Sequence, residues 1–229
     1  MPGRPLTALR LREYRRKMLA MVLAAGIAYP AAGTYTYEID TPSGKTYTTT
    51  VSIATAAKGV TTHESFGAPE TTATTDQTFD PELHERSFAA RQGRNAVTIT
   101  FSADAAIYHV GSQTIRAPLD VPDCVLVDDN VLTELVMLPA VIRATGASQC
   151  TYVVSSRVRS IEGDIVDTPA GSPPARSAKG DAAITVDLEG LHETAWYDPH
   201  TLIPDYIDFG ANNGFAVLTS LLRGRPANQ

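Results

Sequence analysis

The chain has 229 residues, of which 43% are hydrophobic and 19% charged, so it can bury a core and is not intrinsically disordered. Its net charge of −6 argues against a nucleic-acid-binding surface, which needs a basic face. No apolar run reaches the roughly 20 residues of a membrane-spanning helix, and the composition excludes collagen and coiled-coil proteins.

Residues 1–33 differ from the rest of the chain. Five arginines and Lys17 come before an uninterrupted apolar segment, residues 18–28, and small residues follow it. This order is typical of a secretory signal peptide. We therefore predict that residues 1–33 are a signal peptide or an uncleaved N-terminal anchor, and that the protein is exported to the periplasm or the cell exterior. The alternative is an amphipathic or buried first helix of a cytosolic protein.

After this segment, alternating β-branched and aromatic residues predict strands along most of the chain. In the first half the predicted strands cover residues 34–39, 46–55, 60–66, 95–102 and 105–110. In the second half they cover residues 150–158, 183–188, 192–197 and 215–222. Turn signals recur about every 8–12 residues, which indicates an antiparallel meander.

One helix is predicted, over residues 130–144. The polar residues 128–130 offer an N-cap and Gly146 offers a C-cap. Apolar side chains surround most of this helix, so we expect it to be buried on more than one side. Pro139 should kink the helix or split it in two. The simplest place for such a helix is the concave face of the sheet.

The chain contains an internal repeat of a turn motif. Residues 79–81 and 197–199 both read aromatic-Asp-Pro, at an offset of 118, and the same offset without a gap matches Phe88 with Tyr206. Both copies predict a strand end, an Asp-Pro turn and a second strand. We expect Asp80 and Asp198 to be turn residues. Common turn chemistry could also produce this match by chance.

We expect one domain over residues 34–222, a loop at the Pro- and Gly-rich residues 167–180, and a frayed tail over residues 223–229. The fold class is mainly β (α+β): a curved antiparallel sheet, or half-barrel, wrapped around one central kinked helix.

Two cysteines, Cys124 and Cys150, stand 26 residues apart. An even number of cysteines in an oxidising compartment favours one disulfide, and the alternative is two buried thiols. Neither belongs to a CxxC pair, so we predict no metal site and no cofactor.

No enzyme signature stands out. Three His-Glu pairs occur but none extends to the HExxH pattern of zinc proteases. A hydrolase with a site near His192 and His200 is nevertheless one alternative function. A second alternative is a structural or assembly module of the cell envelope that pairs through a sheet edge.

The leading hypothesis is a binding protein. A curved sheet must cover its apolar face, and a kinked helix covers it imperfectly, which leaves a cavity for an apolar guest. The predicted lining of this cavity comes from both the helix and the sheet: Val131, Leu135, Met137, Leu138, Ile142, Phe101, Ile107, Val154, Trp196 and Phe215. The alternative is a filled core without a cavity.

An export signal, a meander with Asp-Pro turns at residues 80–81 and 198–199, and an apolar helix after residues 125–130 together resemble the LolA-type periplasmic half-barrels and their uncharacterised relatives. The resemblance covers residues 34–222. It implies an antiparallel sheet curled around a helical plug that holds acyl chains or similar apolar ligands, with no catalytic signature. This chain departs from the carriers in having one helix candidate and a long loop at residues 167–180.

We therefore expect an exported, non-enzymatic protein that binds a lipid or another apolar molecule. An envelope protein is a further partner under this hypothesis, and nucleic acid is not.

Overall fold

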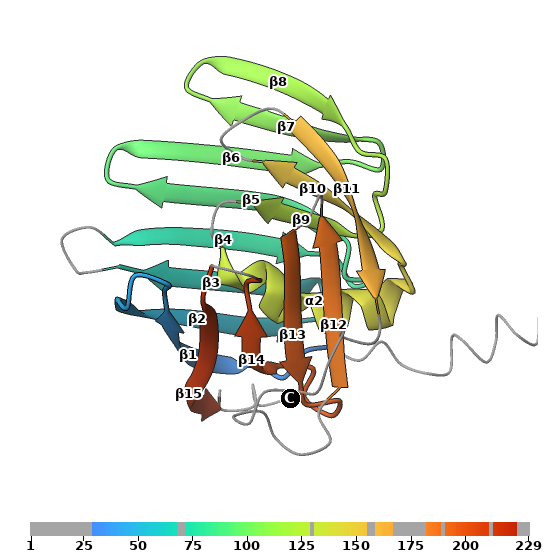
Figure 1. Cartoon of the computed structure of the whole chain (residues 1–229). Coiled ribbons are helices and arrows are strands. Elements are labelled where there is room, and N and C mark those ends of the chain that lie inside the picture. The colour runs from blue at the N-terminus through green and yellow to red at the C-terminus, as the bar shows by residue number, and fades with distance from the viewer. Residues whose placement is uncertain are drawn as a thin grey trace, which may run out of the picture.

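The computed structural model describes residues 29–67, 72–128, 131–154, 159–166, 182–188, 191–210 and 213–223. These residues form one strongly curved β-sheet with a single α-helix on its concave side (Figure 1). The predicted fold class, mainly β with a curved antiparallel sheet around one helix, is confirmed. Residues 1–28, 167–180 and 224–229, where we predicted the signal segment, a loop and most of the tail, lie outside the described residues.

The sheet has 15 strands that form two meanders. The first comprises β1 (Gly33–Asp40), β2 (Thr46–Ala56), β3 (Gly59–Phe66), β4 (Ala73–Phe79), β5 (Glu85–Gln92), β6 (Asn95–Phe101), β7 (Ala105–Val110) and β8 (Gln113–Pro118). The second comprises β10 (Gln149–Val154), β11 (Arg159–Val166), β12 (Ala182–Leu188), β13 (Leu191–Tyr197), β14 (Pro204–Asp208) and β15 (Phe215–Arg223), and β9 (Val125–Asp128) adds to it as a parallel neighbour of β10. Antiparallel pairing of β1 with β15 joins the two meanders into one sheet.

The alternation of side chains decides which face of each strand is buried. In β1, Tyr35 and Tyr37 face the core and are almost fully buried, whereas Glu38 is exposed. Successive side chains of a strand point to opposite faces, so the predicted alternation over residues 34–39 produces one apolar and one polar face.

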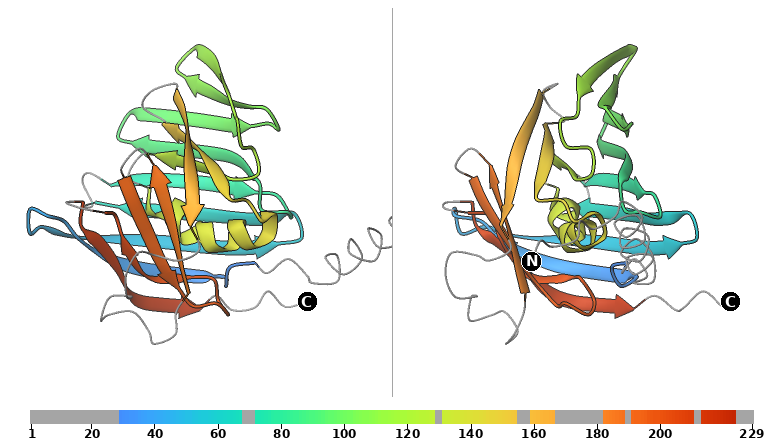
Figure 2. Two further views of the ribbon diagram at one scale, coloured as in Figure 1. Left: turned by 45° about the vertical axis from the view of Figure 1, so that its right-hand side comes forward. Right: turned by 90° about the vertical axis from the view of Figure 1, so that its right-hand side faces the viewer.

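The helix α2 (Leu132–Thr145) connects β9 to β10, the only parallel pair among the described strands. Parallel neighbours need such a crossover connection. The right-hand view of Figure 2 shows the helix almost end-on, between the strands of the first meander and those of the second. Its residues from Leu132 to Val141 are all buried, as the apolar circumference predicts.

The two helix ends have different outcomes. Gly146 caps the C-terminus with φ 68°, and its N–H donates to the Ile142 carbonyl at 2.8 Å, which confirms the predicted C-cap. The predicted N-cap is wrong, because the cap position is Val131 and no side chain of the cap residue bonds to the helix. Pro139 lies inside the helix, which continues to Thr145, so it does not split the helix in two.

The predicted disulfide between Cys124 and Cys150 is present, with the two Cα atoms 4.5 Å apart. It ties the residue before β9 to the start of β10, so it holds the chain on both sides of the helix. The Thr151 N–H also donates to the Cys124 carbonyl at 2.9 Å. The crossover that carries the helix is thus closed at its base by a covalent bond.

The two Asp-Pro motifs occupy equivalent turns, between β4 and β5 and between β13 and β14. Each turn ends in a buried leucine with positive φ: Leu83 at 65° and Leu202 at 59°. The second turn is one residue longer, since Phe79 pairs with Glu85 but Tyr197 pairs with Pro204. The expected match of Phe88 with Tyr206 is therefore wrong after the turn, because a slip of one residue moves a side chain to the other face of the sheet.

Candidate functional site

A cavity of about 560 Å³ lies between the first turn of α2 and the concave face of the sheet. Its walls come from α2, from β9 and β10, and from the ends of strands in both meanders. The lining residues are Ile39, Thr41, Tyr47, Thr49, Phe66, Gly67, Gln92, Leu126, Val127, Val131, Leu132, Glu134, Leu135, Tyr152, Glu193, Phe209 and Asn213. This volume falls within the roughly 300–1,000 Å³ of small-molecule sites.

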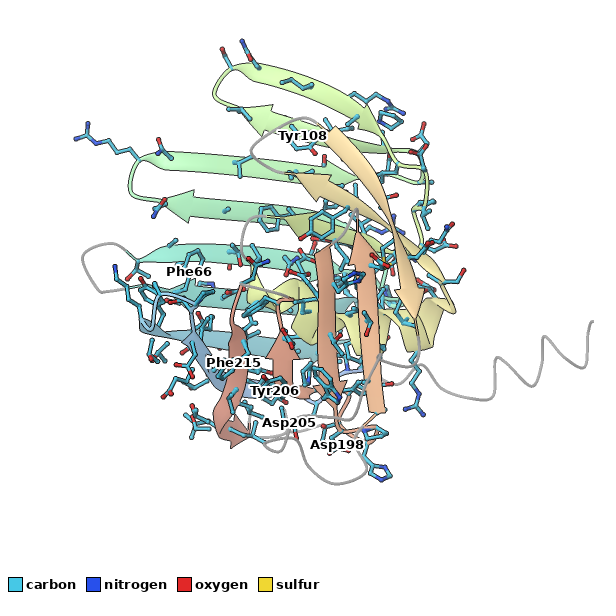
Figure 3. The ribbon with its side chains drawn as sticks, in the orientation of Figure 1. Phe66, Tyr108, Asp198, Asp205, Tyr206 and Phe215 are labelled. Atoms are coloured by element: carbon cyan, nitrogen blue, oxygen red, sulfur yellow. A yellow bond between two sulfur atoms is a disulfide. The ribbon has the colours of Figure 1, made fainter. Side chains whose placement is uncertain are left out.

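The cavity opens at the side of the molecule where β1, β3 and β5 end. Tyr47 is 47% exposed, and Gly67 and Gln92 are also exposed, so these residues form the mouth. Phe66, labelled in Figure 3, is the last residue of β3 and lies next to them. The deep wall is apolar, with Leu126 and Leu132 almost fully buried. The cavity thus has a polar entrance and a mainly apolar interior.

One carboxyl group interrupts the apolar interior. Glu134, on the first turn of α2, lines the cavity and is only 5% exposed. Its carboxyl accepts a hydrogen bond from the Gln77 side-chain amide of β4 and another from the backbone N–H of Val127. The same Gln77 nitrogen donates to Glu85 Oε1 of β5 at 3.1 Å. Gln77 therefore bridges two buried carboxyl groups.

The orientation of Gln77 is fixed by Thr62 of β3, whose hydroxyl donates to Gln77 Oε1 at 3.1 Å. This bond occupies the amide oxygen, so the amide nitrogen faces the two glutamates. The second carboxyl oxygen of Glu85 is buried and has no hydrogen-bond partner among the described residues. The network is therefore short of donors.

A third buried glutamate, Glu64 of β3, holds the start of the helix. Its carboxylate accepts hydrogen bonds from the N–H groups of Leu132 at 3.2 Å and Thr133 at 2.9 Å, and from the Thr133 hydroxyl at 2.7 Å. The first N–H groups of a helix have no partner within the helix, and a negative charge is favourable there. Glu64 thus supplies from the sheet the cap that the chain before α2 does not.

Burial raises the pKa of all three groups, which we call the buried glutamates: Glu64, Glu85 and Glu134. For Glu64, hydrogen bonds from Thr133 and Leu132 oppose the rise in pKa. For Glu134, the neighbouring charge of Glu85 adds to the rise in pKa caused by burial. In the described part of the chain, no Lys, Arg or His forms an ion pair with any of them.

Two of the ten predicted ligand-binding residues, Val131 and Leu135, line the cavity. Met137 and Leu138 are fully buried in the core, and Ile142 packs against that core near the other end of the helix. Phe101 is buried between the two meanders, and Ile107 is half-buried on β7. The side chain of Val154 lies outside the described part.

Trp196 and Phe215 belong to a separate aromatic cluster. Tyr206 lies 5.5 Å from each of them, measured between ring centroids. Figure 3 shows Tyr206 and Phe215 on the strands β14 and β15. Neither Trp196 nor Phe215 lines the cavity. The neighbours of Trp196 on β13, Ala195 and Tyr197, and the neighbour of Phe215 on β15, Ala216, are the residues that pack in the core with the helix.

His192 and His200 are kept apart. His192 lies at the start of β13, where its ring is 3.3 Å from Asp187, and His200 lies in the turn beyond the end of the same strand. At about 3.3 Å per residue, the strand separates them by roughly 20 Å. The structure does not bring these two side chains into one site.

One group of side chains among the described residues has the spacing of metal ligands: Asp80, Glu82 and His84, whose ligand atoms lie within 4.8 Å of one another. Asp80 already accepts hydrogen bonds from the N–H groups of Glu82 and His84 and from the Arg86 guanidinium. These bonds explain the cluster as part of the Asp-Pro turn.

The buried glutamates and Gln77 were not predicted from the sequence. A signal for Glu64 was present, because Val60, Thr62 and Glu64 share one face of β3 by alternation, and Val60 marks that face as buried. The other members are brought together from β4, β5 and α2, and no local pattern reports that contact.

No protein-family model matches the chain, and no curated protein matches it. No helix among the described residues is long and apolar enough to cross a membrane. The resemblance to LolA-type half-barrels stays a prediction.

Proposed function

We propose that this protein binds a small, mainly apolar molecule in the cavity at the start of α2. The observation that carries the proposal is the cavity itself, about 560 Å³ of space between an apolar helix turn and the concave face of the sheet. Lipids and other apolar ligands fit its interior, and the exposed residues at its mouth provide an entrance.

The rigidity of the surroundings supports this function. Glu64 fixes the helix start, and the Cys124–Cys150 disulfide closes the crossover that carries the helix. A wall held by such contacts keeps its shape without a ligand, so less ordering is needed when a ligand binds.

We also propose that the protein acts outside the cytoplasm. The disulfide supports this, since disulfides persist in oxidising compartments, and so does the basic and apolar segment at residues 1–28. Cell fractionation and N-terminal sequencing test it. The proposal predicts a mature N-terminus between residues 26 and 34 in the exported fraction, and full-length protein in the cytoplasm would contradict it.

Ligand binding is tested with Nile red, a neutral apolar dye whose fluorescence rises in apolar surroundings. Gln92→Trp places a large side chain at the mouth, and because Gln92 is exposed the substitution leaves the core intact. The matched control is Gln113→Trp, at an equally exposed strand end beside a hairpin turn and outside the cavity lining.

We expect Gln92→Trp to weaken Nile red binding by about tenfold, which is about 1.4 kcal/mol, and the control to bind like the parent protein. Equal binding by all three proteins, or no binding by any, would contradict the proposal.

A further inference from the structure

We infer that the ligand of this cavity carries a protonated amine on an apolar body, and that the ammonium group binds beside Glu134. This inference rests on the proposed function and specifies the chemical class of the ligand. Its basis is the placement of acidic groups around the cavity, with Glu134 as the one buried carboxyl group of the network that reaches it.

The charge of the lining has one sign. Among the described residues that line the cavity, Glu134 and Glu193 are acidic and none is basic. Glu64 and Glu85 lie behind this wall and are also acidic and buried. Opposite charges across an interface favour binding, and like charges disfavour it. A fatty acid or another anionic amphiphile would therefore place its head group in the wrong field.

The hydrogen bonds indicate the same ligand. Gln77 donates from its amide nitrogen to both Glu85 and Glu134, and its oxygen is occupied by Thr62. Gln77 is the only side chain that donates to Glu134 among the described residues, and it shares the same nitrogen with Glu85. An ammonium group in the cavity would give the Glu134 carboxyl further N–H donors. Its positive charge would also favour the ionised form of Glu134, whose pKa burial raises.

Glu134 is the one member of the network that reaches the cavity. It lies on the first turn of α2 with Val131 and Leu135, whose apolar side chains line the cavity on either side of it. An ammonium group at Glu134 would therefore have its apolar chain against these two side chains and Leu126.

The experiment compares three ligands with the same 12-carbon chain and different head groups: dodecylammonium, dodecanol and dodecanoate. Each displaces Nile red from the full chain at neutral pH and below its micelle concentration. We expect dodecylammonium to bind about tenfold more tightly than dodecanol, and dodecanoate to bind most weakly. Equal affinities, or tighter binding of dodecanoate, would overturn the amine inference and leave the proposed function standing. Displacement by none of the three would overturn both.

Two substitutions locate the preference. Glu134→Gln and Glu193→Gln each replace one carboxyl group of the lining by an amide with almost no change of shape, and Glu38→Gln makes the same change on the exposed face of β1. We expect the ratio of amine to alcohol affinity to fall several-fold in Glu134→Gln, less in Glu193→Gln, and not at all in Glu38→Gln. Thermal unfolding shows which variants are folded. An unchanged ratio in folded Glu134→Gln would overturn the assignment. If that variant does not fold, an unchanged ratio in Glu193→Gln would overturn it.

Discussion

The contact between Glu64 and the start of α2 carries a testable share of the stability. In Glu64→Gln, one acceptor oxygen is replaced by an NH₂ group that faces the N–H groups of the helix. The carboxylate accepts three hydrogen bonds, from Leu132 N–H, Thr133 N–H and the Thr133 hydroxyl, at 3.2, 2.9 and 2.7 Å. The variant keeps at most part of this set and loses the negative charge at the helix N-terminus.

The magnitude follows from these contacts. Hydrogen bonds to charged groups contribute about 1.5–3 kcal/mol each, and a charge at a helix terminus up to about 2 kcal/mol. Burial raises the pKa of Glu64, so the charged form carries a desolvation cost that the amide avoids in part. We therefore expect the free energy of unfolding to fall by about 2–4 kcal/mol.

Urea denaturation, followed by circular dichroism, measures this change. The control is Glu38→Gln on the exposed face of β1, which should stay within about 0.5 kcal/mol of the parent protein. A loss of less than about 0.5 kcal/mol in Glu64→Gln would refute the conclusion that Glu64 caps the helix. The variant should also bind Nile red more weakly, since the turn that it loosens is a wall of the cavity.

Two further predictions concern pH and the disulfide. Burial raises the pKa of the buried glutamates above the usual value of 4.5, so the folded protein binds more protons than the unfolded chain. The stability that this difference contributes is fully present below pH 4.5. It is lost as the pH rises through the raised pKa values. The midpoint of thermal unfolding should therefore be higher at about pH 5 than at about pH 8, and Glu85→Gln should reduce this difference in midpoint. A higher midpoint at about pH 8 would contradict the prediction. The second prediction is that replacing Cys124 and Cys150 together by alanine lowers the free energy of unfolding by about 3–4 kcal/mol in urea titrations. An unchanged urea midpoint would contradict the role given to the disulfide.

Much of the fold could be predicted because its strands alternate cleanly. The predicted strand over residues 46–55 matches β2, and those over residues 60–66 and 95–102 match β3 and β6, because one face of each strand is buried and the other is polar. The helix matches within two residues at its N-terminus and one at its C-terminus. Gly146 marked its end because a helix commonly stops at a residue with positive φ.

Six strands lie outside the predicted strand ranges. Three of them, β4, β5 and β14, were indicated only by the Asp-Pro motif, and the other three were missed for physical reasons. β9 has four residues and is continuously apolar, so it could not be distinguished from the start of the helix that follows it. β8 is short and ends at Pro118, and β11 contains Gly163 and three charged residues, so neither shows a clear alternation. Pairing with neighbouring strands places these segments in the sheet, and that pairing is not a local property.

The candidate site was predictable in part. The expectation of a cavity beside the helix depended on the apolar circumference of residues 131–142, but apolarity alone does not say which end of the helix packs tightly. Met137 and Leu138 fill the core, and the space lies at the first turn, beside Val131 and Leu135. The carboxyl group of Glu134 lines that space and bonds to Gln77 of β4, a contact between distant segments that no local pattern predicts.

The central claim is that the space at the start of α2 holds an apolar chain. A crystal structure of the protein soaked with 12-bromododecanol tests it directly, because the anomalous signal of bromine locates the ligand independently of its head group. The account predicts a bromine peak within the cavity lined by Leu126, Leu132 and Tyr152. A peak only elsewhere on the molecule, with side chains filling the space beside the helix, would contradict it.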